Sequence, residues 1–265
     1  MSCKVVTITS GKGGVGKTTT TANLGVALAQ LGKKVVMIDA DIGLRNLDIV
    51  MGLESRIVYD LVDLVEGRAK LRQAMIRHKQ FPDLFLIPSA QSRDKMAVSP
   101  ADMVQITDQL RLEMDFVLID SPAGIERGFR NAVAPADEIL IVTNPEVSAV
   151  RDADRIIGLL EASKKSQPRL ILNRVKADMV KKGEMLSPED VVDLLSIKLI
   201  GIVPEDENVV PSSNAGEPVT MMANSRAGAA YKEIARRLTG EDVPLTSIEE
   251  KQGFMKRMSR LFGGK

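Results

Sequence analysis

The residues with the clearest chemical meaning form a glycine-rich run at positions 11–18, with the sequence GKGGVGKT. This run fits the pattern G-x-x-x-x-G-K-[ST], with Gly16, Lys17 and Thr18 at its end. Glycines let the backbone curl until its N–H groups converge on phosphate oxygens, and a following helix adds its positive N-terminal end. The run therefore predicts a loop that binds the phosphates of a nucleotide.

Each residue of this loop has an expected contact. Lys17 should reach the β- and γ-phosphates, and Thr18 should offer its hydroxyl group to Mg²⁺. We expect the remaining nucleotide contacts of the loop from Gly11, Lys12, Gly13, Gly14, Val15, Gly16 and Thr19. The alternative is a glycine-rich turn without a ligand. The position of residues 11–18 between a strand-like run and a helical pattern argues against that alternative.

Three aspartates follow apolar runs and are candidates for metal binding and catalysis. Asp39 and Asp41 follow residues 35–38, and Asp120 follows residues 116–119. An aspartate at the carboxyl end of a buried strand can face the nucleotide crevice. We expect Asp39 and Asp120 to hold Mg²⁺ together with Thr18, and Asp41 to orient the attacking water. The alternative for each is an ordinary strand-end or helix-capping aspartate.

The elements that must position these residues alternate along the chain. Seven apolar runs have the length of strands and lack polar alternation, as strands buried on both faces do. They cover residues 5–9, 35–38, 84–87, 116–119, 139–142, 170–172 and 199–203. Helical patterns separate them, at residues 17–31, 100–113, 147–163, 187–195 and 225–239. The expected fold is α/β, a P-loop NTPase with a mostly parallel twisted sheet and helices on both faces.

The chain divides into a large domain and a short C-terminal segment. Residues 1–240 are expected to form one ATPase domain, residues 241–250 a linker, and residues 251–265 an amphipathic helix. Gly240, Pro244 and the acidic residues around them are typical of a linker.

Composition excludes several classes of protein. The chain has one cysteine, Cys3, and one histidine, His78, which excludes an internal disulfide and a cysteine or multi-histidine metal site within one chain. Aromatic residues make up 3%, which argues against a base-stacking platform for single-stranded nucleic acid. No apolar run approaches the length of a membrane span, and the strand-like pattern starts at once, so we expect a cytoplasmic protein.

The charge is unevenly distributed. The net charge is +1, but residues 251–265 hold five basic residues and no acidic one. Removing those five leaves 31 basic residues against 35 acidic ones, so the first 250 residues carry about −4. A mildly acidic body is not typical of a nucleic-acid-binding surface, and we expect no nucleic-acid partner.

The basic C-terminal segment has two faces if it is helical. At about 100° per residue its apolar side chains fall within roughly 120° of one another, with basic side chains opposite. The apolar face comprises Phe254, Met255, Met258, Leu261 and Phe262, and the basic face Lys256, Arg257 and Arg260. This pattern predicts a helix that lies on anionic inner-membrane lipids. A helix packed on the domain, or one in a coiled coil, is the alternative.

A second lysine within the loop points to a particular family. Residues 12–18, KGGVGKT, resemble the K-G-G-x-G-K-[ST] motif of the deviant Walker A (ParA/MinD) family of ATPases. The resemblance implies an ATP-dependent homodimer in which Lys12 reaches the partner's phosphates and acts in catalysis beside Lys17 and Asp41. It also implies that Asn173 reads the base in a pocket formed with Arg174, Pro204 and Glu205. Without the family, Lys12 is a solvated loop lysine, and residues 173–174 and 204–205 are a capped strand end and a surface turn.

Further motifs narrow the resemblance to the cell-division branch of that family. They are residues 41–48 (DIGLRNLD), 120–126 (DSPAGIE) and 143–147 (TNPEV), together with the basic C-terminal segment. The branch implies a Mg²⁺-dependent ATPase, bound to the inner membrane in its ATP form, that recruits the division inhibitor MinC and is stimulated by MinE. It places the surface for these partners at Arg151, Asp152 and Asp154, which by physics alone is a solvated helix face.

Other members of the family fit the residues less well. A partition ATPase is expected to carry a basic DNA-binding body, and an iron protein or cluster carrier needs cysteines that the sequence lacks. The flagellar-number ATPases also have a membrane segment but usually carry an N-terminal extension. A nucleotide-dependent scaffold that does not hydrolyse ATP is the alternative from a different functional class.

Overall fold

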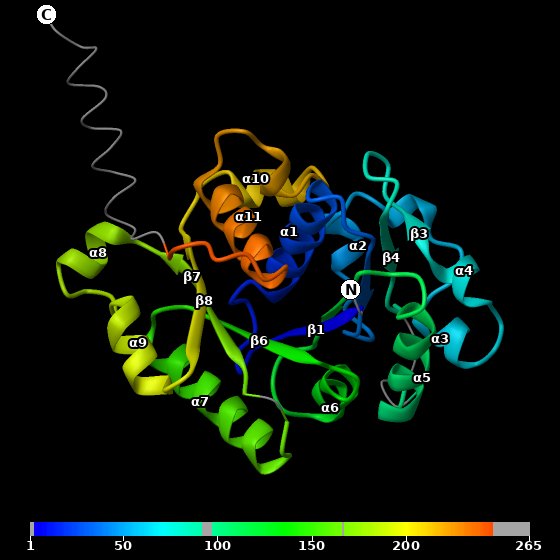
Figure 1. Ribbon diagram of the computed structural model, residues 1–265, viewed down its shortest axis with the longest axis horizontal. Coiled ribbons are helices and arrows are strands. Elements are labelled where there is room, and N and C mark those ends of the chain that lie inside the picture. Colours follow the sequence, from blue (N-terminus) through cyan, green and yellow to red (C-terminus); the bar gives the residue numbers. More distant parts are fainter. Residues whose placement is uncertain (1–2, 92–96, 166, 246–265) are drawn as a thin grey trace, which may run out of the picture.

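A computed structural model describes residues 3–91, 97–165 and 167–245 of the chain (Figure 1). The expected membrane helix at residues 251–265 lies outside the described residues, as does the second half of the expected linker. Those two expectations therefore stay predictions.

The centre of the fold is an eight-stranded sheet with the order β3-β4-β2-β5-β1-β6-β7-β8. Every neighbouring pair is parallel except β3 with β4. The strands are β1 (Lys4–Thr9), β2 (Val35–Asp39), β3 (Ile76–Arg77), β4 (Leu84–Ile87), β5 (Phe116–Asp120), β6 (Glu138–Thr143), β7 (Arg169–Val175) and β8 (Lys198–Pro204). Because β2, β5, β1 and β6 lie side by side, their carboxyl ends meet at one edge of the sheet.

Helices cover both faces of the sheet (Figure 1). One face packs on α1 (Lys17–Gln30) and α11 (Arg226–Leu238), through residues such as Leu24 and Ile234. The other face packs on α5 (Pro100–Leu110), α6 (Arg127–Val133), α7 (Val147–Ala162) and α9 (Pro188–Leu195). Alternate residues of one strand, such as Leu118 and Ile119 of β5, enter different cores, because side chains alternate across a strand.

The seven expected strands and five expected helices are all present, which confirms the predicted α/β fold. The sequence reading missed β3, a two-residue antiparallel strand too short to leave a pattern. It also missed the shorter helices. They are α2 (Leu47–Val50), η1 (Glu54–Arg56), α3 (Leu61–Val65), α4 (Leu71–Ala74), α6 (Arg127–Val133), α8 (Ala177–Lys181), α10 (Val209–Asn214) and η2 (Val219–Met221).

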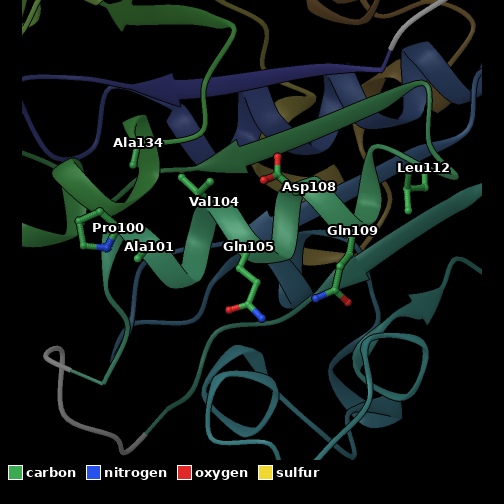
Figure 2. Close-up of a pocket in the computed structure, with 8 residues that line it drawn as sticks. All are labelled: Pro100, Ala101, Val104, Gln105, Asp108, Gln109, Leu112 and Ala134. Atoms are coloured by element: carbon green, nitrogen blue, oxygen red, sulfur yellow. The ribbon is translucent and has the colours of Figure 1, made fainter.

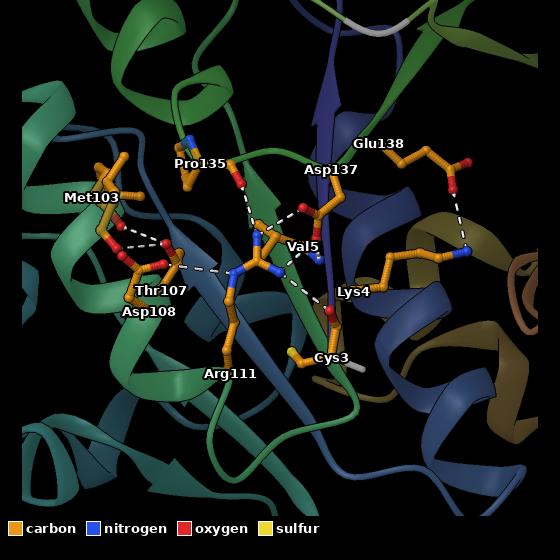
Figure 3. Close-up of polar contacts among 11 residues, drawn as sticks. Cys3, Lys4, Val5, Met103, Thr107, Asp108, Arg111, Pro135, Asp137 and Glu138 are labelled. Atoms are coloured by element: carbon orange, nitrogen blue, oxygen red, sulfur yellow. Dashed lines mark hydrogen bonds and ion pairs between the residues drawn. The ribbon is translucent and has the colours of Figure 1, made fainter. Parts of the chain in front are cut away.

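An ion-pair cluster connects the residue after α5 with the amino ends of β1 and β6 (Figure 3). Arg111, which follows α5, donates to both carboxylate oxygens of Asp137, at 2.7 and 2.8 Å. It also donates to the backbone oxygens of Cys3 and Pro135. Burial raises the pKa of the Cys3 thiol to about 11, so this cysteine is protonated at neutral pH. The cluster has a structural role.

Candidate functional site

The phosphate loop connects β1 to α1 and depends on two glycines with positive φ. Gly14 has φ 77° and Gly16 has φ 102°, values that side chains other than glycine rarely adopt. Gly16 is also confined in space, because a Cβ there would lie 2.3 Å from Nδ2 of Asn173. Backbone curvature and close packing both require glycine at position 16.

Lys17 opens α1 and is buried at the base of the loop. Its Nζ donates to Oγ of Ser10, at 3.0 Å. Burial lowers the pKa of Lys17, while the carboxylates of Asp120 and Asp41 oppose that shift. The ammonium group is buried from water, and its hydrogen-bond acceptor is a neutral hydroxyl group. It is therefore suited to bind an anion, because the anion would compensate its positive charge.

The next residue links the loop to the end of β5. Thr18 donates its hydroxyl to Oδ2 of Asp120 at 2.6 Å, and Thr21 donates to Oδ1 of the same carboxylate at 3.2 Å. Thr18 and Thr21 lie three residues apart on α1 and therefore share the face that meets β5. The fold thus brings together two of the three expected metal ligands.

Asp39, the third expected ligand, lies beside Asp120 because β2 and β5 are parallel neighbours with these residues in register. Its oxygens accept hydrogen bonds from the backbone N–H groups of Asp41 (2.9 Å), Asn46 and Leu47 (both 3.3 Å). Burial raises the pKa of Asp39 and of Asp120, and the charge of Asp120 raises that of Asp39 further. Two buried carboxyl groups side by side favour a bound cation.

Lys12, the second lysine of the loop, lies against the start of α7. Its Nζ donates to Oγ of Ser148 at 3.2 Å and lies 3.5 Å from a carboxylate oxygen of Glu146. The side chain is 41% exposed, in contrast to the buried Lys17. The two lysines of the loop therefore occupy different environments, one internal and one at the surface.

The expected base-binding residues lie at the carboxyl ends of β7 and β8. Nδ2 of Asn173 donates to the backbone oxygen of Val15 at 2.8 Å, so this amide supports the phosphate loop. Arg174 has φ 57° and is exposed. Glu205 donates its backbone N–H to the backbone oxygen of Val175, which joins the two strand ends. Arg174 and Glu205 also line a cavity of about 600 Å³ that extends to α8 and the start of α7.

The expected partner surface lies on α7, directly against the phosphate loop. A Cβ on Gly11 would lie 2.1 Å from the backbone oxygen of Asp152, so the loop and the helix are in contact. Arg151 is exposed, and Asp152 lies 3.5 Å from Arg155 in an ion pair. Asp154 shares the exposed side of the helix with Arg151. The structure thus places these residues on a helix that also contacts the nucleotide loop.

Another cavity, of about 640 Å³, runs along the outer face of α5 (Figure 2). Its wall is formed by Pro100, Ala101, Val104, Gln105, Asp108, Gln109, Leu112 and Ala134. No lysine or arginine is among these lining residues, and Asp108 is the one charged residue of the set. We assign it no part in nucleotide binding.

The sequence reading missed four residues of the site. Ser10 and Thr21 bond to Lys17 and Asp120, and Glu146 and Ser148 hold Lys12. Thr21 could have been found from its i+3 spacing after Thr18 on one helix. The other three reach their partners only through the folding of the loop and the packing of α7.

Comparison with known proteins decides the family. The family model described as the CobQ/CobB/MinD/ParA nucleotide binding domain matches residues 6–219. The septum site-determining protein MinD of Bacillus subtilis (strain 168) is 54% identical over 263 residues, 98% of each chain. The chain belongs to the MinD family. It is therefore a nucleotide-binding member of the MinD/ParA ATPases, related to proteins of septum site determination.

Solved structures of MinD proteins have the same fold. A MinC:MinD cell division protein complex from Aquifex aeolicus matches with TM-score 0.86 and 50% identity, over 92% of this chain and 99% of that one. A MinD from Pyrococcus horikoshii OT3, complexed with Mg-ADP, matches with TM-score 0.80 and 30% identity, over 89% and 96%. Within the described ranges, the structure of the present MinD-family chain has no helix that could cross a membrane.

Proposed function

We propose that this chain hydrolyses ATP to ADP and phosphate in a Mg²⁺-dependent reaction, as a homodimer that positions the division septum from the inner membrane. The observation that carries the ATPase proposal is the group at the end of the central strands. There a buried lysine, a threonine hydroxyl bonded to a buried aspartate, and a second buried aspartate lie under one glycine-rich loop.

Nucleotide binding follows from the loop and the strand ends. Backbone N–H groups of residues 11–19 and the ammonium of Lys17 bind the phosphates, and burial of that ammonium favours binding of an anion. The base lies at Asn173, Arg174, Pro204 and Glu205. The relative complexed with Mg-ADP supports this class of ligand.

The residues around Asp120 fit Mg²⁺. Mg²⁺ prefers hard oxygen ligands and takes one or two from protein carboxylates, with phosphate and water completing its shell. Thr18, Asp120 and Asp39 offer such oxygens. Because the two carboxyl groups are buried, a bound cation that compensates their negative charge would stabilise them. When bound, the ion would supply positive charge at the phosphate oxygens.

Lys12 and Asp41 accelerate the hydrolysis of ATP. In the dimer Lys12 leaves Glu146 and Ser148 and reaches the partner's phosphates, where positive charge stabilises the charge that develops on them. Asp41, whose N–H bonds to Asp39, orients the water that attacks the γ-phosphorus. The exposed position of Lys12 in the single chain supports a role toward a second copy.

Membrane and partner binding rest on the sequence and the relatives. Anionic lipids bind residues 251–265, whose basic and apolar residues suit such a surface. MinC binds the dimer, as the MinC:MinD complex of a 50% identical relative supports. The surface proposed for this contact is that of α7, at Arg151, Asp152 and Asp154. MinE binds the same surface and stimulates hydrolysis. Attachment through two tails is stronger than through one, so dimerisation controls it.

The test is phosphate release from ATP by the full chain, with and without anionic liposomes and with Mg²⁺ or excess chelator. We expect slow release that requires Mg²⁺ and rises with lipid. No release under any condition, despite ATP-dependent dimerisation, would instead establish a nucleotide-dependent scaffold.

A further inference from the structure

We propose that Asp206 is a positioning residue that holds the base-contacting loop, residues 204–206, and thereby sets the preference for ATP over GTP. The inference rests on the proposed placement of the base at Pro204 and Glu205. Asp206 itself has no assigned contact with nucleotide, metal or partner.

The carboxylate of Asp206 is buried and accepts four hydrogen bonds. One oxygen, Oδ1, accepts from the backbone N–H of Asn208 at 3.0 Å and from its Nδ2 at 2.8 Å. The other oxygen, Oδ2, accepts from Oγ of Ser225 at 2.8 Å and from the backbone N–H of Ala227 at 3.1 Å. Because the four donors have fixed positions, the carboxylate of Asp206 can accept all four hydrogen bonds in one orientation only.

The charge on this carboxylate persists at all physiological pH values. Burial alone would raise the pKa of Asp206, but hydrogen bonds from Asn208, Ala227 and Ser225 lower it to about 2. Hydrogen bonds to an ionised acceptor are about twice as strong as neutral ones. The ionised carboxylate of Asp206 therefore holds the loop more strongly than an amide or a hydroxyl group in the same place would.

These contacts join the end of β8 to the beginning of α11. Ser225 caps that helix, because its Oγ accepts from the N–H of Gly228 at 2.8 Å. Arg226 adds a contact, from Nη2 to the backbone oxygen of Glu205 at 3.3 Å. Asp206 thus fixes the loop to a helix of the main body.

That helix also packs on the helix that follows the phosphate loop. Tyr231 of α11 and Thr20 of α1 have their hydroxyl oxygens 3.3 Å apart, and Thr220, just before α11, donates to Asn23 of α1 at 2.8 Å. Residues that would contact the base and residues that would contact the phosphates are therefore held on one body. The distance between the two ends of the nucleotide site depends on this anchor.

Base preference depends on the exact place of hydrogen-bonding groups. Adenine presents an amino donor where guanine presents a carbonyl acceptor, so an acceptor on the protein favours one and repels the other. A site that hydrogen-bonds its ligand discriminates strongly only when its groups are held in position. Release of the loop should therefore weaken base recognition and leave the phosphate contacts of Lys17 intact.

The experiment measures dissociation constants of the full chain for ATP, GTP and tripolyphosphate, each with Mg²⁺, by calorimetry. The variant is Asp206→Asn, whose NH₂ group must face one of the two pairs of donors, those of Asn208 or those of Ser225 and Ala227. The control is Asp102→Asn, because Asp102 likewise accepts from the start of a helix, at Ser99, but belongs to α5. Ser225→Ala removes one of the four donors and should have a smaller effect if Asp206→Asn folds poorly.

We expect Asp206→Asn to weaken ATP binding on the order of tenfold, which corresponds to the loss of about one well-placed hydrogen bond. GTP and tripolyphosphate should bind as they do to the unchanged chain, so the ATP-to-GTP preference falls. Equal weakening of ATP and tripolyphosphate, or an unchanged ATP-to-GTP ratio in both variants, would overturn the inference. An unchanged chain that binds no nucleotide would instead overturn the proposed function.

Discussion

The hydroxyl group of Thr18 donates a hydrogen bond of 2.6 Å to Oδ2 of Asp120, across 102 residues of sequence. This contact connects the phosphate loop to the central strand β5 and lies where the magnesium site is proposed. Thr18→Val, which removes the hydroxyl at nearly constant volume, should weaken Mg-ATP binding on the order of tenfold or more. Calorimetry with and without Mg²⁺ checks this expectation.

Thr18→Ser is the matched control, because serine keeps the hydroxyl group and loses one methyl group. It should retain most of the Mg²⁺-dependent affinity. If Thr18→Val binds Mg-ATP as well as Thr18→Ser does, the hydroxyl is no metal ligand.

Lys12→Ala should abolish lipid-stimulated ATP turnover while leaving nucleotide binding nearly unchanged. The expected loss is on the order of 10²-fold or more, the effect of removing one charge that stabilises the transition state. Binding survives because Lys17, not Lys12, is the buried lysine of the loop. Lys79→Ala, an exposed lysine near the opposite edge of the sheet, is the control and should keep full turnover. Normal stimulation in Lys12→Ala contradicts the trans role.

Asp41→Ala should bind ATP and dimerise but hydrolyse it very slowly, because the attacking water loses its orienting carboxylate. Light scattering with Mg-ATP should therefore show a persistent dimer, whereas the unchanged chain returns to monomer as ATP is consumed. A variant that stays monomeric with Mg-ATP would argue against this assignment of Asp41.

Phe262→Glu should release the protein from anionic vesicles, because it places a charge on the expected apolar face of residues 251–265. Co-sedimentation with Mg-ATP and with Mg-ADP measures the effect. Ser259→Glu introduces the same charge in the same segment, outside the five apolar positions, and should weaken binding much less. Equal binding of Phe262→Glu and the unchanged chain would point to a segment that packs on the domain or on another protein.

The contribution of His78 to stability should be lost between neutral and mildly acidic pH. Burial lowers the pKa of His78, and its Nδ1 accepts backbone N–H bonds from Gln80 at 3.2 Å and Phe81 at 3.3 Å. The folded state favours the neutral ring, so its contribution is complete above the ordinary pKa of about 6.5 and is lost as pH falls below it. Urea unfolding at pH 7.5 and pH 5.5 measures the loss.

His78→Gln is the control for that measurement, since His78 is the one histidine of the sequence. This variant should be less stable at pH 7.5 and should lose less stability between the two pH values. An equal pH dependence in both proteins would contradict the assignment of the loss to His78.

Local patterns were sufficient to predict the long strands and helices and the position of the glycine-rich loop between β1 and α1. The apolar runs predicted every long strand because burial on both faces demands continuous apolar residues. The glycine spacing predicted the loop because residues other than glycine rarely adopt the backbone angles found at Gly14 and Gly16. Short elements such as β3 and α2 were missed, since two to four residues carry no period.

Residue types in sequence therefore determined which groups are present: two loop lysines, three strand-end aspartates, and a basic, apolar C-terminal segment. Only the tertiary structure decided which of them meet. The strand order made Asp39 and Asp120 neighbours. The packing of α7 placed Glu146 beside Lys12, and the position of β7 placed Asn173 beside the backbone of Val15. The tertiary structure also joined Asp206 to Ser225. Such contacts depend on crossovers and packing between distant segments, which no local period or propensity encodes.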